Sequence, residues 1–127
     1  MEGLVKISSI AAGGALGAVA RYLVNVSPLA EVFRRFPLAT FVINVVGSFL
    51  VGFFLIVFTD KIAVSDGVRM GVMVGFLGAF TTFSTFEAEI YGLVRERQFT
   101  LSIAYLVVSV VLGFAAVLSG VALGRKI

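Results

Sequence analysis

Four long apolar runs constrain this chain more than any other feature of its sequence. They cover residues 4–24, 38–58, 68–94 and 101–123. Each meets the roughly 17 to 25 residues that a helix needs to cross the hydrocarbon core of a bilayer. The connecting segments are too short to form a separate soluble domain. We therefore predict an all-α membrane protein in which residues 1–127 form one domain of four transmembrane helices.

The composition argues against two other classes of function. Hydrophobic residues make up 60% of the chain and charged residues 13%, which is far from the balance of soluble domains. The chain has neither cysteine nor histidine; because these residues supply thiol chemistry and the commonest general base, we do not expect an enzyme. The net charge is +3, but the basic residues are spread over loops and termini, so we expect no nucleic-acid partner.

The third apolar run contains the most unusual stretch, residues 75–89, which reads GFLGAFTTFSTFEAE. A continuous helix over residues 68–94 would be about 40 Å long, whereas the hydrocarbon core is about 30 Å thick. Gly75, Gly78 and the hydroxyl residues that follow are poor helix formers. We predict that this helix is broken near the membrane midplane. Irregular backbone at that depth must be buried in protein or line a watery cavity, so the break is the candidate site.

A broken helix offers opposite partial charges at its two inner ends. The first half ends in unpaired carbonyls that suit a cation, and the second half begins with free N–H groups that suit an anion. There is no carboxylate near Gly78 and Thr81, so a cation there would be held by backbone oxygen. The donors for an anion are an amide, two hydroxyls and the polarised edges of two phenyl rings, at Asn44, Ser84, Thr85, Phe83 and Phe86. Such weak donors bind loosely, as conduction requires.

Ordinary structural roles remain open for several of these residues. Asn44 could instead form an interhelical hydrogen bond, and Ser109 could bond the carbonyl one turn before it. The phenyl rings could face lipid. Arg21 could extend to the lipid headgroups or place a positive charge at the mouth of an aqueous vestibule. An ion pair between Arg21 and Glu89 is also within reach if successive spans alternate in direction.

Small residues recur at intervals of four at the start of the third run, at Gly67, Gly71, Gly75 and Ala79. This spacing places them on one helix face, where another backbone can approach closely. We expect this face to form the tightest backbone contact of the assembly.

The residues at the break resemble a known family. The string GFLGAFTTFSTF at residues 75–86 is similar to the signature of the Fluc/CrcB fluoride channels. The resemblance extends over the whole chain, through the glycines that precede Arg21, Asn44 in the second span, and the number of spans. It implies a fluoride-selective channel of the cell (inner) membrane that lets cytoplasmic fluoride leave passively and so relieves its toxicity. It also implies an antiparallel, dual-topology homodimer with two fluoride pores and a central structural Na⁺.

The resemblance also implies a role for each matching residue. The carbonyls of Gly78 and Thr81 would bind the Na⁺ at the dimer interface. The fluoride path would be lined by Asn44, Phe83 and Phe86, with a polar track and a vestibule cation formed by Ser84, Thr85, Ser109 and Arg21.

The charges at the ends of the spans bear on orientation. Alternating spans divide the ten Lys and Arg residues equally. The side of the N-terminus receives Lys6, Lys61, Arg69, Arg125 and Lys126, and the other side receives Arg21, Arg34, Arg35, Arg95 and Arg97. Orientation follows the Lys/Arg bias of short loops, and here there is none. We therefore expect the chain to insert in both orientations and to pair antiparallel.

Two other functions compete with the channel. A small four-span, proton-coupled exporter of cationic drugs would need a carboxylate deep in its substrate cavity. The first span has no acidic residue after Glu2, which leaves only Glu87 and Glu89 as candidates. A non-conducting accessory subunit would explain the small-residue faces but would leave Asn44 and the interrupted third span without a purpose.

Overall fold

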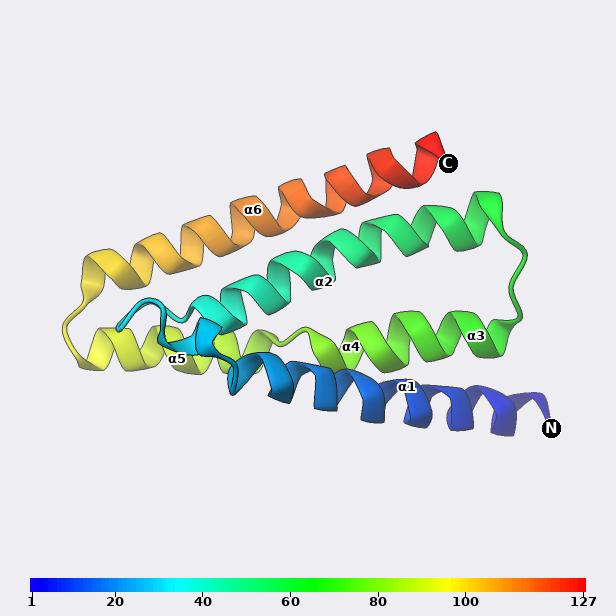
Figure 1. The fold of residues 1–127 in the computed structure, drawn as a ribbon, viewed down its shortest axis with the longest axis horizontal. Helices are drawn as coiled ribbons and strands as arrows, with labels where there is room; N and C mark the ends of the chain where they lie inside the picture. Colours follow the sequence, from blue (N-terminus) through cyan, green and yellow to red (C-terminus); the bar gives the residue numbers. More distant parts are fainter.

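The computed structural model describes residues 1–127, and four helical segments dominate it (Figure 1). The segments long and apolar enough to span a membrane are Glu2–Asn25, Leu38–Lys61, Asp66–Arg95 and Phe99–Lys126. They contain all four predicted runs, so the prediction of four transmembrane helices is confirmed. Successive segments alternate in direction. Both termini therefore lie at the same end of the bundle as the turn between the second and third spans (Figure 1).

The first and fourth spans are continuous α-helices, whereas the second and third are composite. The continuous helices are α1 (Glu2–Asn25) and α6 (Phe99–Lys126). The second span is α2 (Leu38–Ile56) followed by a π-helical turn, η2 (Val57–Lys61). The third span consists of α3 (Asp66–Met70), the π-helical segment η3 (Gly71–Phe76), α4 (Leu77–Phe80) and α5 (Phe83–Arg95). A short 3₁₀ helix, η1 (Pro28–Glu31), lies in the first loop.

Local chemistry explains several helix ends. Pro37 directly precedes α2; it cannot continue a preceding helix because it lacks an N–H. Ser65 caps α3, because its hydroxyl accepts from the Val68 N–H at 3.3 Å. Between α5 and α6, Arg97 has a φ of 57°, a left-handed conformation that helps the chain reverse direction.

The spans pack in an interleaved order, the first on the third and the second on the fourth. A Cβ added at Gly13 would collide with the Gly71 carbonyl of η3, and one at Gly17 with the Phe76 carbonyl. The predicted close contact of the third span is therefore present. The contact of α2 with α6 is equally close, since a Cβ at Gly120 would collide with the Phe49 carbonyl. The small-residue face of the third span is thus not the single tightest contact of the protomer.

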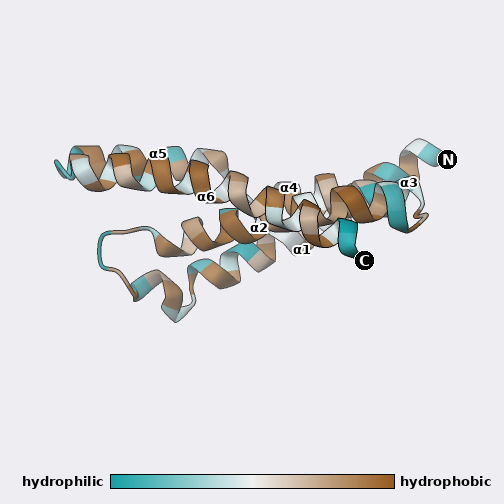
Figure 2. Cartoon of the chain, turned by 90° about the horizontal axis from the view of Figure 1, so that it is seen from above, coloured by the Kyte–Doolittle hydropathy of each residue, from teal (hydrophilic) through white to brown (hydrophobic).

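Few residues of the protomer are buried. Only 19 of the 127 residues are buried. Most apolar side chains therefore face the surroundings of the protomer rather than an internal core. Figure 2 shows hydrophobic residues along most of the length of the helices and hydrophilic ones mainly towards their ends. The one compact apolar cluster contains Phe86, Leu93 and Tyr105. It fixes α5 against α6, next to the interruption of the third span.

Candidate functional site

The third span is interrupted at Thr81 and Thr82, which are both extended. Thr81 has φ −77° and ψ 155°, and Thr82 has φ −150° and ψ 117°. Helical backbone resumes at Phe83. The interruption falls inside the stretch that the sequence singles out, and it leaves the backbone groups of Thr82 without helical partners.

Asn44 of α2 supplies the missing partners. Its Oδ1 accepts from the Thr82 N–H at 2.9 Å, and its Nδ2 donates to the Thr82 carbonyl at 3.1 Å. The orientation of the amide follows from its partners, because a backbone N–H can only donate and a carbonyl can only accept. Of the two roles open for Asn44, the interhelical hydrogen bond is present. The second N–H of the Asn44 amide can donate to a ligand.

Thr82 is the residue that the sequence-based site omits. Its hydroxyl accepts from the Thr85 N–H at 3.2 Å and so caps the N-terminus of α5. A Thr directly before a helix is a recognised N-cap signal, and this signal was present in the sequence. Thr81 uses its own hydroxyl differently, donating to the Leu77 carbonyl at 2.8 Å at the end of α4.

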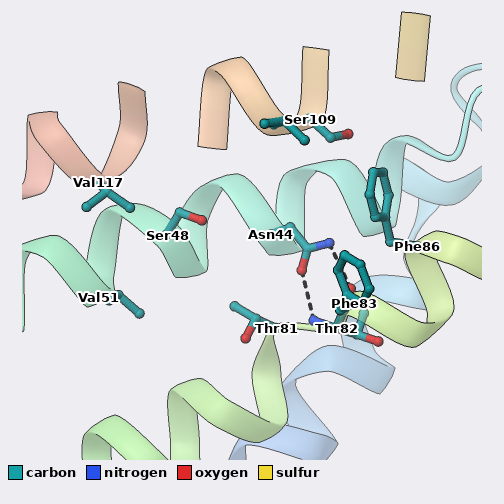
Figure 3. Close-up of a pocket in the computed structure, with 10 residues that line it drawn as sticks. Asn44, Ser48, Val51, Thr81, Thr82, Phe83, Phe86, Ser109 and Val117 are labelled. Carbon is teal, nitrogen blue, oxygen red and sulfur yellow. Dashed lines mark hydrogen bonds between the residues drawn. The ribbon is translucent and has the colours of Figure 1, made fainter. Parts of the chain in front are cut away.

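A cavity of about 330 Å³ opens beside the interruption (Figure 3). It is lined by side chains of α2, the interruption, α5 and α6: Asn44, Ser48, Val51, Thr81, Thr82, Phe83, Phe86, Ser109, Val110 and Val117. The structure therefore brings together four of the residues predicted for the fluoride path, namely Asn44, Phe83, Phe86 and Ser109.

The two phenyl rings of the cavity differ in their surroundings. Phe83 is 74% exposed in the protomer, whereas Phe86 is 5% exposed. Their ring centroids lie 6.2 Å apart, and the Phe86 ring meets Tyr105 edge to face at 5.0 Å. Phe86 is thus held in place by packing, while Phe83 projects into the open part of the cavity (Figure 3).

The Ser109 hydroxyl is buried and has no hydrogen-bond partner in the protein. The bond to its own helix that the sequence left open is therefore not formed. An unsatisfied buried hydroxyl is costly, and Ser109 is the one residue of the cavity lining that carries such a group.

The other three residues predicted for the fluoride path lie outside this cavity. Ser84 is exposed on α5. Thr85 lines a second cavity of about 310 Å³ that also contains Thr40 and Glu89. Arg21 is partly exposed on α1 and lines neither cavity.

The Arg21–Glu89 ion pair that the sequence left open is not formed. The carboxylate of Glu89 accepts from the Thr40 hydroxyl at 2.6 Å. The ion pair in the structure joins Lys6 and Asp66 at 3.1 Å, at the opposite end of the bundle from Arg21. A short hydroxyl donor on the adjacent α2 satisfies Glu89 without any contribution from α1.

The backbone at the interruption fits a cation that binds carbonyl oxygen. In a continuous helix, the N–H groups of Thr82 and Thr85 would bond the carbonyls of Gly78 and Thr81. Here Thr82 donates to Asn44 and Thr85 donates to the Thr82 hydroxyl. The two carbonyls predicted for Na⁺ are therefore released from these bonds, and the structure contains no cluster of acidic side chains that would favour a divalent ion instead.

Comparison with known proteins gives a consistent result over nearly the full chain. The family model described as CrcB-like protein, Camphor Resistance (CrcB), matches residues 8–121. The fluoride-specific ion channel FluC of Solibacter usitatus is 42% identical over 122 residues, covering 96% of this chain and 100% of that protein. The FluC proteins of Saccharophagus degradans and Magnetococcus marinus are 43% and 39% identical, over 98% and 97% of this chain and 92% and 100% of their own lengths.

Proposed function

Because this chain belongs to the CrcB family, we propose that it is a fluoride-selective ion channel of the cell membrane. Fluoride enters cells as the neutral acid HF and ionises in the more alkaline cytoplasm. A pore for the anion lets the membrane potential, which is negative inside, drive fluoride out. The protein thereby lowers the cytoplasmic fluoride concentration without an energy source of its own.

The observation that carries this proposal is the chemistry of the 330 Å³ cavity. A small anion must exchange its water for other donors, at a large desolvation cost if none are present. The cavity offers the free N–H of Asn44, the unpartnered hydroxyl of Ser109, and the rings of Phe83 and Phe86, whose edges carry partial positive charge. None of these is a full positive charge, so fluoride can leave as well as bind.

The remaining three residues extend the fluoride path beyond the cavity. Ser84 and Thr85 follow Phe83 on α5 and supply hydroxyl donors between the cavity and one end of the bundle. Arg21 contributes a positive charge near that end, which raises the local concentration of anions. In this proposal the fluoride path has seven residues, four that line the cavity and three along its approach.

The functional unit is an antiparallel, dual-topology homodimer in which the interruption of the third span lies near the membrane midplane. Two observations support this assembly. The Lys and Arg residues divide equally between the two ends of the alternating spans, and few residues of the protomer are buried. A second copy would cover apolar surface that faces outward in the single chain.

A structural Na⁺ at the dimer interface would be held by the Gly78 and Thr81 carbonyls of both protomers. Their release from helical hydrogen bonds supports this assignment, and neutral oxygen ligands suit a hard monovalent cation. When bound, the ion supplies positive charge where partial negative charges of carbonyls gather. The protein's own residues orient those carbonyls, and fluoride passes through the cavity on their other side.

The drug-exporter alternative is less favoured. Among the residues that line the 330 Å³ cavity there is no acidic side chain, whereas proton-coupled export requires one. Glu89 lies in the second cavity and is bonded to Thr40.

Fluoride efflux from liposomes that contain only the purified protein tests the function. Vesicles loaded with potassium fluoride, with valinomycin to balance charge, should release fluoride to an electrode far faster than protein-free vesicles. Vesicles loaded with potassium chloride should release little chloride. Proton-driven uptake of an organic cation without fluoride efflux would instead support the exporter, and neither activity would support an accessory subunit.

A further inference from the structure

Two side chains intercept N–H groups at the interruption of the third span. Asn44 Oδ1 accepts from the Thr82 N–H at 2.9 Å, and Thr82 Oγ1 accepts from the Thr85 N–H at 3.2 Å. These are the N–H groups that a continuous helix would direct to the carbonyls of Gly78 and Thr81. Each side chain therefore replaces one carbonyl as the acceptor.

The consequence for the backbone is direct. The Thr81 carbonyl accepts no hydrogen bond from the protein, and the Gly78 carbonyl accepts none from Thr82. Gly78 is exposed and Thr81 is partly exposed in the protomer, so a ligand can reach these carbonyls, and a second copy that covered them would leave them unpaired unless something bound them. Asn44 also donates to the Thr82 carbonyl through its Nδ2, so both backbone groups of Thr82 would have to leave Asn44 before the residue could become helical.

We propose that Asn44 and Thr82 are positioning residues for the cation site, because they keep the carbonyls of Gly78 and Thr81 free to bind Na⁺. This inference rests on the Na⁺ site proposed above. It gives Asn44 a second role beside that of an anion donor and gives Thr82 a functional role. It also means that one amide, on α2, connects the fluoride path with the cation site.

The test compares Na⁺-dependent stability of hydroxyl and non-hydroxyl variants at residue 82. Purified protein is held at constant ionic strength while Na⁺ replaces N-methyl-D-glucamine, and the midpoint of thermal unfolding is measured. Ligands that bind only the folded state raise this midpoint. Thr82 is 7% exposed, so Thr82→Val keeps the β-branched shape and removes the hydroxyl, whereas Thr82→Ser keeps a hydroxyl that can accept from Thr85.

We expect Thr82→Val and Asn44→Ala each to raise the half-saturating Na⁺ concentration about 10- to 100-fold, as loss of a residue that orients a metal ligand does. Thr82→Ser should stay near the wild-type value. Ser48→Ala is the matched control for Asn44→Ala, because Ser48 lies one turn further along α2, lines the same cavity and does not contact Thr82 through a hydrogen bond. The half-saturating Na⁺ concentration of Ser48→Ala should equal that of the wild type.

Hydrogen exchange gives a second readout that does not depend on Na⁺ affinity. The Thr85 amide should exchange faster in Thr82→Val than in Thr82→Ser, because only the serine retains an acceptor for it. If Asn44→Ala does not fold, the two Thr82 variants still decide the question.

The outcomes separate this inference from the Na⁺ site on which it rests. If the wild type shows no response to Na⁺, the cation site itself is absent and the inference fails with it. If the wild type responds, and Thr82→Val responds at the same Na⁺ concentration, the site stands and the positioning role is refuted. A shift in Thr82→Ser as large as that in Thr82→Val would also refute it, because the hydroxyl would then be irrelevant.

Discussion

Replacing Phe83 with isoleucine tests the role of the phenyl rings more cleanly than any other change in the cavity. The Phe83 ring is 74% exposed in the protomer, and its only aromatic neighbour is Phe86 at 6.2 Å. Loss of that pair costs about 0.5–1.5 kcal/mol at most, so Phe83→Ile should fold. Phe86 also packs on Tyr105 at 5.0 Å, and its replacement would disturb the α5–α6 contact as well as the cavity.

The expected loss of flux follows from the loss of one polarised ring edge. Isoleucine preserves bulk and apolarity but offers no edge with partial positive charge. If the edge acts on desolvated fluoride as a hydrogen bond to a charged group does, its removal costs about 1.5–3 kcal/mol. If this free-energy cost is added to the barrier for conduction, the rate of fluoride flux falls about ten- to a hundredfold or slightly more.

The assay is fluoride efflux from liposomes at equal protein density, with thermal unfolding of the same samples. Phe114→Ile is the control, because Phe114 is similarly exposed at 64% but lies on α6 away from the cavity. We expect Phe114→Ile to conduct at the wild-type rate. If Phe83→Ile also does so, the ring is packing and its edge does not interact with the ion.

Three further predictions concern topology, packing and the vestibule. Single cysteines in the 62–65 loop should react with an impermeant reagent from both sides of the membrane; labelling from one side only would contradict dual topology. Gly75→Ala should destabilise the protein by about 1–3 kcal/mol, because the added Cβ would lie 2.6 Å from the Ile10 carbonyl oxygen. Gly92→Ala, where nothing lies within 4 Å, should be neutral or stabilising in the same unfolding assay. Arg21→Gln should lower fluoride flux at low ionic strength and much less at high, since salt screens exposed charge; an equal loss at both would show that Arg21 does not act through its charge.

The sequence was sufficient to predict the four spans, because each apolar run exceeds the length needed to cross a bilayer and lies inside one spanning segment. It also singled out the stretch in which helical backbone stops at Phe80 and resumes at Phe83. Gly75, Gly78 and the hydroxyl residues after them carry this information locally.

Contacts between distant residues could not be predicted in the same way. Asn44 meets Thr82 from 38 positions away, so the sequence left its role open. The sequence placed Arg21 within reach of Glu89, but in the structure the Glu89 carboxylate bonds the Thr40 hydroxyl of α2. The π-helical segment η3 lies inside an apolar run and η2 begins inside another, and these runs predicted only helix. Thr82 is a different case, because its N-cap signal was present and only its importance was missed.

The interleaved packing of the spans has a consequence for biogenesis. The glycine face of α1 meets η3, and Gly52 of α2 meets α6, so the closest backbone contacts join spans that are not adjacent in the chain. During synthesis α1 and α2 insert into the bilayer as separate helices. Their close-packing partners, η3 and α6, are made only later, with the second half of the chain. The orientation of the first two spans is therefore fixed before these close contacts form. An approximately equal mixture of the two orientations would have to be set by the insertion machinery, and packing could not correct it afterwards.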